Sequence, residues 1–522
     1  MKKTFIITLI GLMVCGMSGC ASENPSTTTI EENTEKADTE TEKNYVVSTK
    51  SIATGNVSSP VSVHDPSIFE ADGEYYIYGS HMTAAKSQDL MNWEYIADGY
   101  VKTNPVYGQV YEDPEAFRYS GNKDSVIATD DGSTHVWAPD VIKNNADGKF
   151  YMYYCMSSTW NASNLCYGVS DSPEGPFTYM GPLIYSGFNY GSLSDTDVTE
   201  YVDEDYAKKH YIKSGAYNYE DYPNAIDPTV FYDKDGRLWM VYGSWSGGIF
   251  LLEIDESTGK VIHPDGDEEA GVDAYFGKRL LGGGHISIEG PYILYDPDTD
   301  YYYLYVSYGS LTSNGGYQIR VFRSKEVCGD YEDMNGERPL KSAMHENYGL
   351  KLSGNYKLPS LERAYMATGH NSAFIDSDGR KYVVYHTRFN DGTENHSPRV
   401  HQILMNEDGW PCMLPYQTQG EEAGTINPDE IPGRYYVIDQ GTGINADIAN
   451  PFILYLNEDG TLDGENISGS WDSKDGSYYI HLALDDKEYS GVLCRMKDEA
   501  GTEVFTFSAV GSNESVWGVK YD

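Results

Sequence analysis

The sequence predicts an all-β protein, a five-bladed β-propeller followed by a small antiparallel barrel or sandwich. Three observations support this prediction. A strand–turn–strand unit recurs five times along the chain, and its second strand is rich in tyrosine. Four of the five turns contain Asp-Gly, a strong hairpin signal. No amphipathic helix of useful length interrupts the pattern.

The five copies span Val63 to Ser80, Val136 to Ser157, Ala225 to Ser244, Ile288 to Ser310 and Gly369 to Arg388. Each of the first four copies has a proline near its start, and we align these prolines with a serine in the fifth copy. The aligned residues are Pro66, Pro139, Pro228, Pro291 and Ser372. They are spaced by 73, 89, 63 and 81 residues. Each interval can hold a four-stranded sheet, and such a repeat is typical of a propeller. We therefore expect the blades over residues 55–425.

The pattern changes after Pro415. A glycine-rich stretch from Gly420 to Gly443 leads into five or six short strands joined by hairpins. We expect a second domain, a β-barrel or sandwich, over residues 426–522.

The N-terminus has the features of a processing segment, which we place at residues 1–20. Two lysines precede an apolar run from Phe5 to Val14, which is too short to span a bilayer comfortably. Small residues directly before Cys20 resemble a bacterial lipobox, so we expect Cys20 to be lipidated. A plain secretory signal with an incidental cysteine is the alternative. Residues 21–54 have little to bury and are expected to form a disordered tether to the cell surface.

Composition excludes some partners. With 80 acidic and 37 basic side chains, the net charge of −43 repels nucleic acid and anionic lipid. We expect a monomer that binds no nucleic acid. No cysteine pair beyond the leader has CxxC spacing, so neither a zinc site nor a full disulfide framework is indicated. Cys155 and Cys166 flank a predicted turn, and the sequence does not decide whether they pair.

Carboxylates recur at the start of the copies. The residue before the aligned position is Asp65, Ala138, Asp227, Gly290 or Asn371, and Glu289 lies one residue earlier in the fourth copy. Because the first strand of each blade lines the central channel, Asp65, Asp227 and Glu289 are expected to converge there. An Asp before Pro can simply form a turn, but three buried like charges are costly unless function requires them.

Such a trio suits glycoside hydrolysis. An ionised carboxylate activates water, and a protonated one donates to the departing oxygen. A third carboxylate raises the pKa of the acid by repulsion.

These residues resemble glycoside hydrolase family 43, specifically its arabinanases. Seven landmarks in order carry the resemblance: VHDPSIF, HVWAPDV, NAIDPTVF, GSWSGGIFLLEID, IEGPYILYDPDTDYYYLYVSYGS, GHNS and RVHQILMNEDGWP. The resemblance implies an inverting endo-α-1,5-L-arabinanase in which Asp65 is the general base, Asp227 the pKa modulator and Glu289 the general acid. It also implies that the C-terminal region is the appended domain of two-domain extracellular members. The family often has Ala at Gly290 and Pro at Thr368; neither difference removes a functional group.

The same resemblance indicates some further site residues, and the sequence itself indicates others. His370 matches a histidine that reaches a metal, usually calcium, held on the channel axis mostly by water; a plain strand histidine is the alternative. The side chains that match the lining of the binding cleft are Asn224, Ser244, Trp245 and Ser246. Trp137 and Trp160 are possible stacking platforms, with packing between blades as the alternative. Arg388 could bind sugar hydroxyls or balance the acidic trio.

Three other functions compete with arabinan hydrolysis. An arabinofuranosidase or β-xylosidase of the same family would differ in loops that close the cleft. A fructan-active propeller enzyme would carry Arg-Asp-Pro and Glu-Cys signatures, which this sequence lacks. A surface glycan-binding lipoprotein without catalysis is a third reading, against which the intact trio argues.

Overall fold

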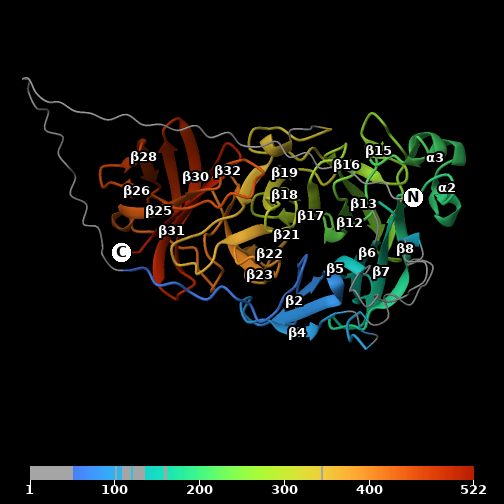
Figure 1. Ribbon diagram of the computed structural model, residues 1–522, viewed down its shortest axis with the longest axis horizontal. Coiled ribbons are helices and arrows are strands. Elements are labelled where there is room, and N and C mark those ends of the chain that lie inside the picture. Colours follow the sequence, from blue (N-terminus) through green and yellow to red (C-terminus); the bar gives the residue numbers. More distant parts are fainter. Residues whose placement is uncertain are drawn as a thin grey trace, which may run out of the picture. The chain divides into compact units, whose positions relative to one another are not determined.

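The computed structural model describes residues 51–99, 101, 103–107, 119–120, 136–157, 161–341 and 345–521. These residues form five large antiparallel sheets, one two-stranded sheet and a closed eight-stranded barrel (Figure 1). The first strands of the sheets contact one another in a closed ring, β1 with β5, β5 with β11, β11 with β17, β17 with β21, and β21 with β1. The predicted five-bladed propeller with a small C-terminal β-domain is confirmed, and that domain is a barrel.

Each blade is built from consecutive strands. Blade one has β1 (Ser67–Ala71), β2 (Glu74–Gly79), η1 (Ser80–Met82), β3 (Thr83–Ser87) and β4 (Glu94–Ala97). Blade two has β5 (Val136–Lys143), β6 (Phe150–Ser157), β7 (Ser163–Ser170) and β8 (Thr178–Ser186). Blade three has β11 (Thr229–Tyr232), β12 (Leu238–Tyr242), β13 (Ile249–Asp255) and β16 (Gly277–Leu281), extended by β14 (Lys260–Ile262) and β15 (Val272–Asp273).

The last two blades follow the same plan. Blade four has β17 (Ile288–Asp296), β18 (Tyr301–Tyr308), β19 (Gln318–Ser324), η3 (His345–Asn347) and β20 (Leu350–Ser353). Blade five has β21 (Tyr365–Ile375), β22 (Lys381–Phe389), β23 (Ser397–Met405) and β24 (Pro411–Met413). Between blades two and three lie η2 (Leu193–Asp195), α2 (Val198–Tyr201), α3 (Glu204–His210), β9 (Ile212–Lys213) and β10 (Ala216–Tyr217).

The barrel closes by pairing its first strand with its last. It contains η4 (Pro428–Glu430), β25 (Gly433–Asp439), β26 (Phe452–Leu456), β27 (Thr461–Gly464), β28 (Ile467–Ser473), β29 (Tyr479–Leu484), β30 (Lys487–Lys497), β31 (Glu503–Gly511) and β32 (Glu514–Lys520). Closure leaves no unpaired sheet edge.

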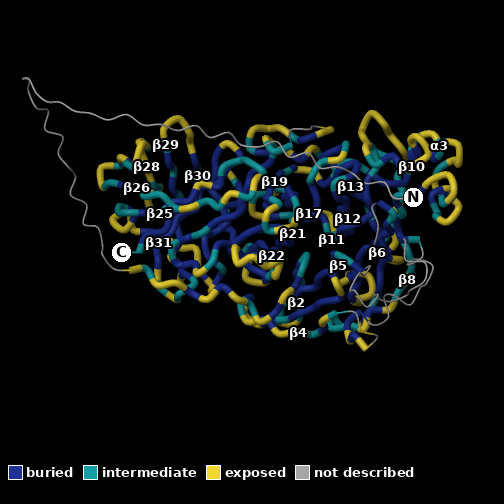
Figure 2. The backbone as a smooth tube through the Cα atoms, in the orientation of Figure 1, coloured by how far each residue is buried: buried dark blue, intermediate teal, exposed yellow. Residues whose placement is uncertain are grey.

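Each of the five predicted hairpins forms, as β1–β2, β5–β6, β11–β12, β17–β18 and β21–β22. The strands are buried on both sides, and exposure is concentrated in the connecting turns (Figure 2). One hydrophobic cluster lies between each pair of neighbouring blades, including blades five and one. Packing on both faces explains why the strands read as nearly continuous apolar runs.

A residue with positive φ, here called the bulge residue, marks the same place in every blade. Asp65, Ala138, Asp227, Gly290 and His370 have φ of 54°, 41°, 57°, 55° and 47°. In blades two, four and five the strand register shifts at this residue and the next. His370 is therefore the equivalent of Asp65, and our alignment of Ser372 with the prolines is wrong by one residue. The fifth copy has no proline, so the sequence offered no anchor for the alignment.

The bulged residue also bonds each blade to the one before it. Its backbone N–H leaves the local sheet and donates across the interface, from Ala138 to Ser80 Oγ (2.9 Å), Asp227 to the Cys155 sulfur, Gly290 to Asp227 Oδ2 (3.3 Å), His370 to Ser307 Oγ (2.7 Å) and Asp65 to His386 Nδ1 (3.2 Å). These five bonds run around the whole axis and include the closure of blade five onto blade one. At the opposite end of the same strands the channel opens into a cavity of about 560 Å³.

The barrel packs against blades four and five. Tyr356 of the propeller and Trp517 of the barrel belong to one buried cluster, with ring centroids 5.0 Å apart. Lys351 Nζ donates to the backbone oxygens of Gln440 (2.8 Å) and Gly443 (3.0 Å). Apolar burial together with buried polar bonds joins the two parts into one compact unit.

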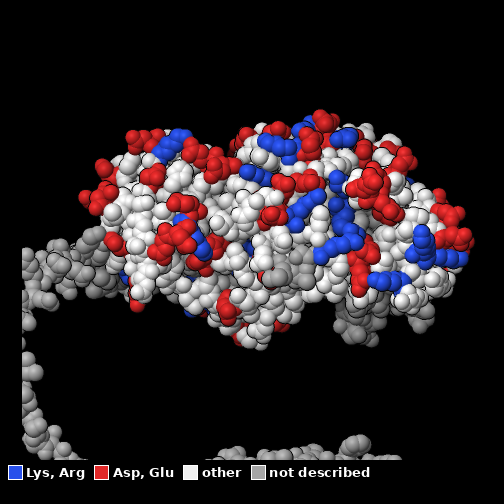
Figure 3. Space-filling model, turned by 90° about the horizontal axis from the view of Figure 1, so that it is seen from above, with Lys and Arg blue, Asp and Glu red and all other residues white. Residues whose placement is uncertain are grey.

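The five cysteines in the described ranges are free, so Cys155 and Cys166 do not pair. On the face drawn in Figure 3, acidic side chains are spread over both parts, while Lys and Arg gather in smaller patches. None of the helices in the described ranges has both the length and the apolar character needed to cross a bilayer.

Candidate active site

The three predicted carboxylates meet at one mouth of the channel. Asp65 and Asp227 occupy the bulge position of blades one and three, and Glu289 directly precedes the bulge residue Gly290 of blade four. Asp227 and Glu289 are 6% and 9% exposed. Their charges act on one another, because both Glu289 and Asp65 raise the pKa of Asp227. The structure thus brings together residues that are far apart in the chain.

Asp65 is held as a carboxylate by histidines. Its Oδ1 lies 3.1 Å from His370 Nδ1, and its Oδ2 lies 3.0 Å from His64 Nδ1. Ser80 Oγ donates to Oδ2 over 2.5 Å. Burial by itself raises the pKa of Asp65, but His370, His64 and His386 together hold that pKa well below its usual range. Asp65 is therefore ionised throughout the neutral range.

Asp227 has the opposite protonation. Burial raises its pKa well above the usual range, and the charges of Glu289 and Asp65 raise it further. Among the described residues, the contact that lowers this pKa is the backbone N–H of Gly290, at 3.3 Å from Oδ2. Asp227 therefore retains its proton at neutral pH.

Glu289 is positioned by the segment that follows β12 of blade three. Ser244 Oγ donates to its Oε2 over 2.9 Å, and Trp245 Nε1 donates to the same oxygen over 2.8 Å. Trp245 has a φ of 55° and its backbone N–H donates to Ile288. The Ser244–Trp245 segment fixes one oxygen of Glu289 and leaves Oε1 without a hydrogen bond from these donors.

A cluster of histidines surrounds Asp65 and bears on the predicted metal. His64, Asp65 and His386 each offer one ligand atom, and these atoms lie within 4.8 Å of one another. His386 Nδ1 already accepts the Asp65 N–H, whereas His64 Nε2 has no hydrogen-bond partner among the described residues. Imidazoles outnumber carboxylates here, so calcium, which prefers oxygen ligands, fits only if water supplies most of its coordination.

The remaining predicted site residues fall into two groups. Ser246 Oγ donates to Asn161 Oδ1 (3.1 Å) and Asn224 accepts from Ser186 (3.4 Å), so both belong to the contact between blades two and three. Trp137 directly precedes the bulge residue Ala138, so it occupies in blade two the position that Glu289 occupies in blade four. It packs partly against the hydrophobic cluster between blades two and three. Trp160 and Cys20 lie outside the described residues.

Arg388 does not touch the trio directly. Its Nη1 lies 3.1 Å from His386 Nε2, and its Nε pairs with Glu394 Oε2 at 2.7 Å. His386 in turn contacts Asp65. Arg388 therefore supports the histidine that supports the base.

Sequence reasoning missed residues at the ends of the second strands, or directly after them. Three side chains accept the backbone N–H groups of bulge residues: Ser80 from Ala138, Ser307 from His370, and His386 from Asp65. A signal was available, because these residues occupy repeat-equivalent positions near the end of the second strand of their hairpins. Our alignment compares only the first strands of the copies, so it does not include these positions.

The chain matches known proteins over nearly all of its described length. Residues 54–222 and 206–411 match the family described as Glycosyl hydrolases family 43. The chain belongs to this family. Residues 415–518 match the domain described as a C-terminal lipocalin-like domain. This family 43 chain is thus a glycoside hydrolase with an appended barrel.

Several relatives share both parts of this family 43 chain. It is 41% identical over 479 residues to extracellular endo-α-(1→5)-L-arabinanase 2 of Bacillus subtilis, covering 88% of this chain and 93% of the relative. It is 38% identical to the extracellular endo-α-(1→5)-L-arabinanase of Thermotoga petrophila, with 88% and 94% covered. The crystal structure of the Thermotoga petrophila endo-1,5-α-L-arabinanase matches with a TM-score of 0.77 at 37% identity, covering 90% of this chain and 100% of that one.

Proposed function

We propose that this chain is an extracellular endo-arabinanase that hydrolyses internal α-1,5-L-arabinofuranosidic bonds of arabinan with inversion of configuration. The observation that carries the proposal is the meeting, at one channel mouth, of Asp65, which is held by His370 and His64, with the buried carboxyls of Asp227 and Glu289. Relatives named as extracellular endo-arabinanases, similar along both domains, support the substrate and the location.

Asp65 acts as general base. Its ionised carboxylate accepts a proton from a water molecule as the water oxygen attacks the anomeric carbon. The imidazoles of His64 and His370 and the Ser80 hydroxyl fix the orientation of the carboxylate. The new carbon–oxygen bond forms on the face opposite the departing group, which inverts the anomeric configuration.

Glu289 acts as general acid. It donates the proton of the Asp227–Glu289 pair to the glycosidic oxygen as the bond from that oxygen to the anomeric carbon breaks. Asp227 modulates this step, because its buried carboxyl competes for the same proton and favours a protonated pair. The proton taken up by Asp65 then returns to solvent, and the pair is reprotonated.

Substrate contacts extend from the trio along the blade ends. We assign sugar binding to Asn224, Ser244, Trp245 and Ser246, stacking to Trp137 and Trp160, and a supporting charge to Arg388. Trp137 supports this assignment because its register position is that of Glu289 and its side chain stays partly exposed. Aromatic faces suit the apolar face of a sugar ring.

A cation, by resemblance Ca²⁺, is proposed on the channel axis beside His370, with water completing its shell. The unpartnered His64 Nε2 and the Asp65 carboxylate are the nearby groups that suit such an ion. When bound, the ion supplies positive charge next to the base. Attachment of the N-terminus to the bacterial surface through a lipid on Cys20 is a separate proposal, supported by the sequence before that cysteine.

Product analysis tests the function. The purified protein is incubated with linear arabinan, arabinoxylan and xylan, and the products are separated by size while NMR follows the first anomer released. We expect a ladder of arabino-oligosaccharides from arabinan, with inverted configuration at the new end. Release of single arabinose from chain ends would indicate an arabinofuranosidase, release of xylose a xylosidase, and no release a binding protein.

A further inference from the structure

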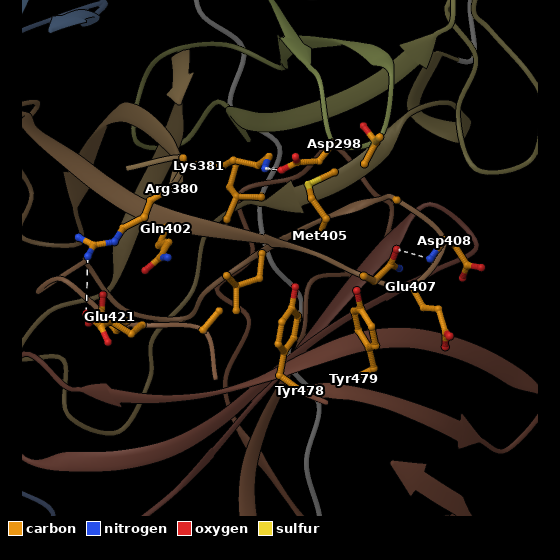
Figure 4. A pocket seen from close by; sticks show the side chains of 18 of the residues that line it. Asp298, Arg380, Lys381, Gln402, Met405, Glu407, Asp408, Glu421, Tyr478 and Tyr479 are labelled. Carbon is orange, nitrogen blue, oxygen red and sulfur yellow. Dashed lines mark hydrogen bonds and ion pairs between the residues drawn. The ribbon is translucent and has the colours of Figure 1, made fainter. Parts of the chain in front are cut away.

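Another cavity lies on the face of the propeller away from the trio, where blades four and five meet the barrel (Figure 4). Its volume is about 740 Å³, within the range of ligand sites. Its upper wall comes from the β17–β18 and β21–β22 turns and from strand β23, and its lower wall from the barrel. Glu289 and Asp296 lie at opposite ends of β17, so the cavity and the trio are roughly 20 Å apart by strand rise.

Two adjacent tyrosines form the barrel wall of this cavity. Figure 4 shows the rings of Tyr478 and Tyr479 standing up from the barrel toward strand β23, with their hydroxyls leading. Their centroids are 4.8 Å apart. Both residues are half-buried, so part of each ring faces the cavity. Aromatic faces with polar tips suit ligands that carry both C–H faces and hydroxyls.

An unsatisfied acceptor faces the tyrosines from the propeller wall. Gln402 lines the cavity, is 3% exposed, and its Oε1 has no hydrogen-bond partner among the described residues. In Figure 4 its amide lies on the side of strand β23 that faces Glu421 and Tyr478. A buried acceptor without a donor is costly, and a ligand that donates hydrogen bonds removes the cost.

The charge of the lining limits what can bind. Six acidic and two basic side chains line the cavity, and the basic ones are already paired, Lys381 with Asp298 (2.7 Å) and Arg380 with Glu422 (3.7 Å). Anions such as phosphate or uronic acids are therefore repelled. A neutral ligand rich in hydroxyl donors satisfies both the acceptors and the aromatic wall.

We propose that this cavity is a second, non-catalytic binding site for a neutral glycan, and that its ligand is the arabinan chain itself. The choice of arabinan rests on the proposed function. Because the cavity is on the face away from the trio, it cannot be a subsite of the cleft. It holds the polymer near the enzyme between cuts, which raises the effective concentration of substrate at the channel mouth.

Binding measurements in an inactive background test the proposal. The full chain carrying Glu289→Gln is titrated with linear arabinan or xylan. Binding at the active site is the same in every variant compared, because none of the further substitutions lies near the trio. Tyr479→Ala removes one aromatic wall, and Ala423→Trp fills the cavity from an exposed loop position, where folding is not at risk. Tyr455→Ala, on β26 and outside the lining, is the matched control.

We expect the two cavity variants to weaken arabinan binding about fivefold or more, while the control binds as the parent does. In the active background, the same two variants should lower the rate on polymer relative to the rate on arabinotriose. Equal arabinan affinity in Ala423→Trp and the control would overturn the proposal. A loss seen with xylan but not arabinan would overturn the choice of ligand. A wild-type protein that binds arabinan but never cuts it would overturn the proposed function alone.

Discussion

The carboxylate of Asp227 accepts a hydrogen bond from the backbone N–H of Gly290, the residue directly after Glu289, over 3.3 Å. The modulator is thus bonded to the chain that carries the acid. Any movement of Asp227 is transmitted to Glu289 through one peptide unit.

Asp227→Asn is expected to lower kcat about 100-fold on arabinan, because the pair loses its titrating partner while the shape is kept. Burial and the neighbouring charges raise the pKa of Asp227, so Asp227 holds its proton at neutral pH. Without that partner the alkaline limb of the pH–rate profile should move to lower pH. A profile unchanged in position would contradict the modulating role.

Glu289→Ala should reduce hydrolysis of arabinan by about a thousandfold, within the usual range for removal of a general acid. An aryl arabinoside with a very good leaving group needs little proton donation, so its hydrolysis should be far less affected. Initial rates on both substrates give the comparison. Equal losses on the two would show that Glu289 is not the acid.

Gly290→Ala should cost about 1 kcal/mol of unfolding free energy, because alanine is strained at the φ of 55° found there. Its Cβ would also lie 3.3 Å from the His370 ring, so the base site should be disturbed and kcat should fall. Gly73→Ala is the matched control, since φ is 81° and its Cβ would meet nothing within 4 Å. If both variants lose stability but neither loses kcat, the His370 contact has no catalytic effect.

Asp140 joins three blades in the channel and should make stability depend on pH. It is 1% exposed, is bonded to Ser67 Oγ of blade one, and accepts the Val230 N–H of blade three over 2.6 Å. Burial raises its pKa from 3.8 to about 7. Because the folded pKa is raised, the contribution is fully present below about pH 4 and is lost as pH rises through about 7.

Asp140→Asn imitates the protonated acid and should remove this dependence. Urea unfolding at several pH values between 5 and 7 measures it. We expect the wild type to lose up to about 1.4 kcal/mol per pH unit more than the variant. Parallel pH curves for the two proteins would show that Asp140 keeps its charge in the folded state.

Metal removal tests the axial cation. Treatment with a chelator should lower both activity and melting temperature, and added Ca²⁺ should restore them, since a bound ion stabilises the folded state by mass action. His370→Ala should make the protein insensitive to the chelator. Unchanged activity and melting temperature after chelation would remove the metal from the mechanism.

The repeat of short apolar strands and Asp-Gly turns was enough to predict the blades, because hairpin formation depends on local sequence. The meeting of Asp65, Asp227 and Glu289 also followed from the repeat, since equivalent positions of a propeller share one axis. The fifth blade was misaligned by one residue, because a bulge at His370 carries no proline to mark it.

The sequence by itself determined which residues recur at the channel mouth and, with them, the class of chemistry. The tertiary structure alone decided how those residues are held. Ser80, Cys155, Ser307 and His386 accept backbone N–H groups from the following blade. The protonation of Asp65 and Asp227 likewise depends on groups that other blades supply. Hydrogen bonds and charges act through space, and only the closed ring of blades sets those distances.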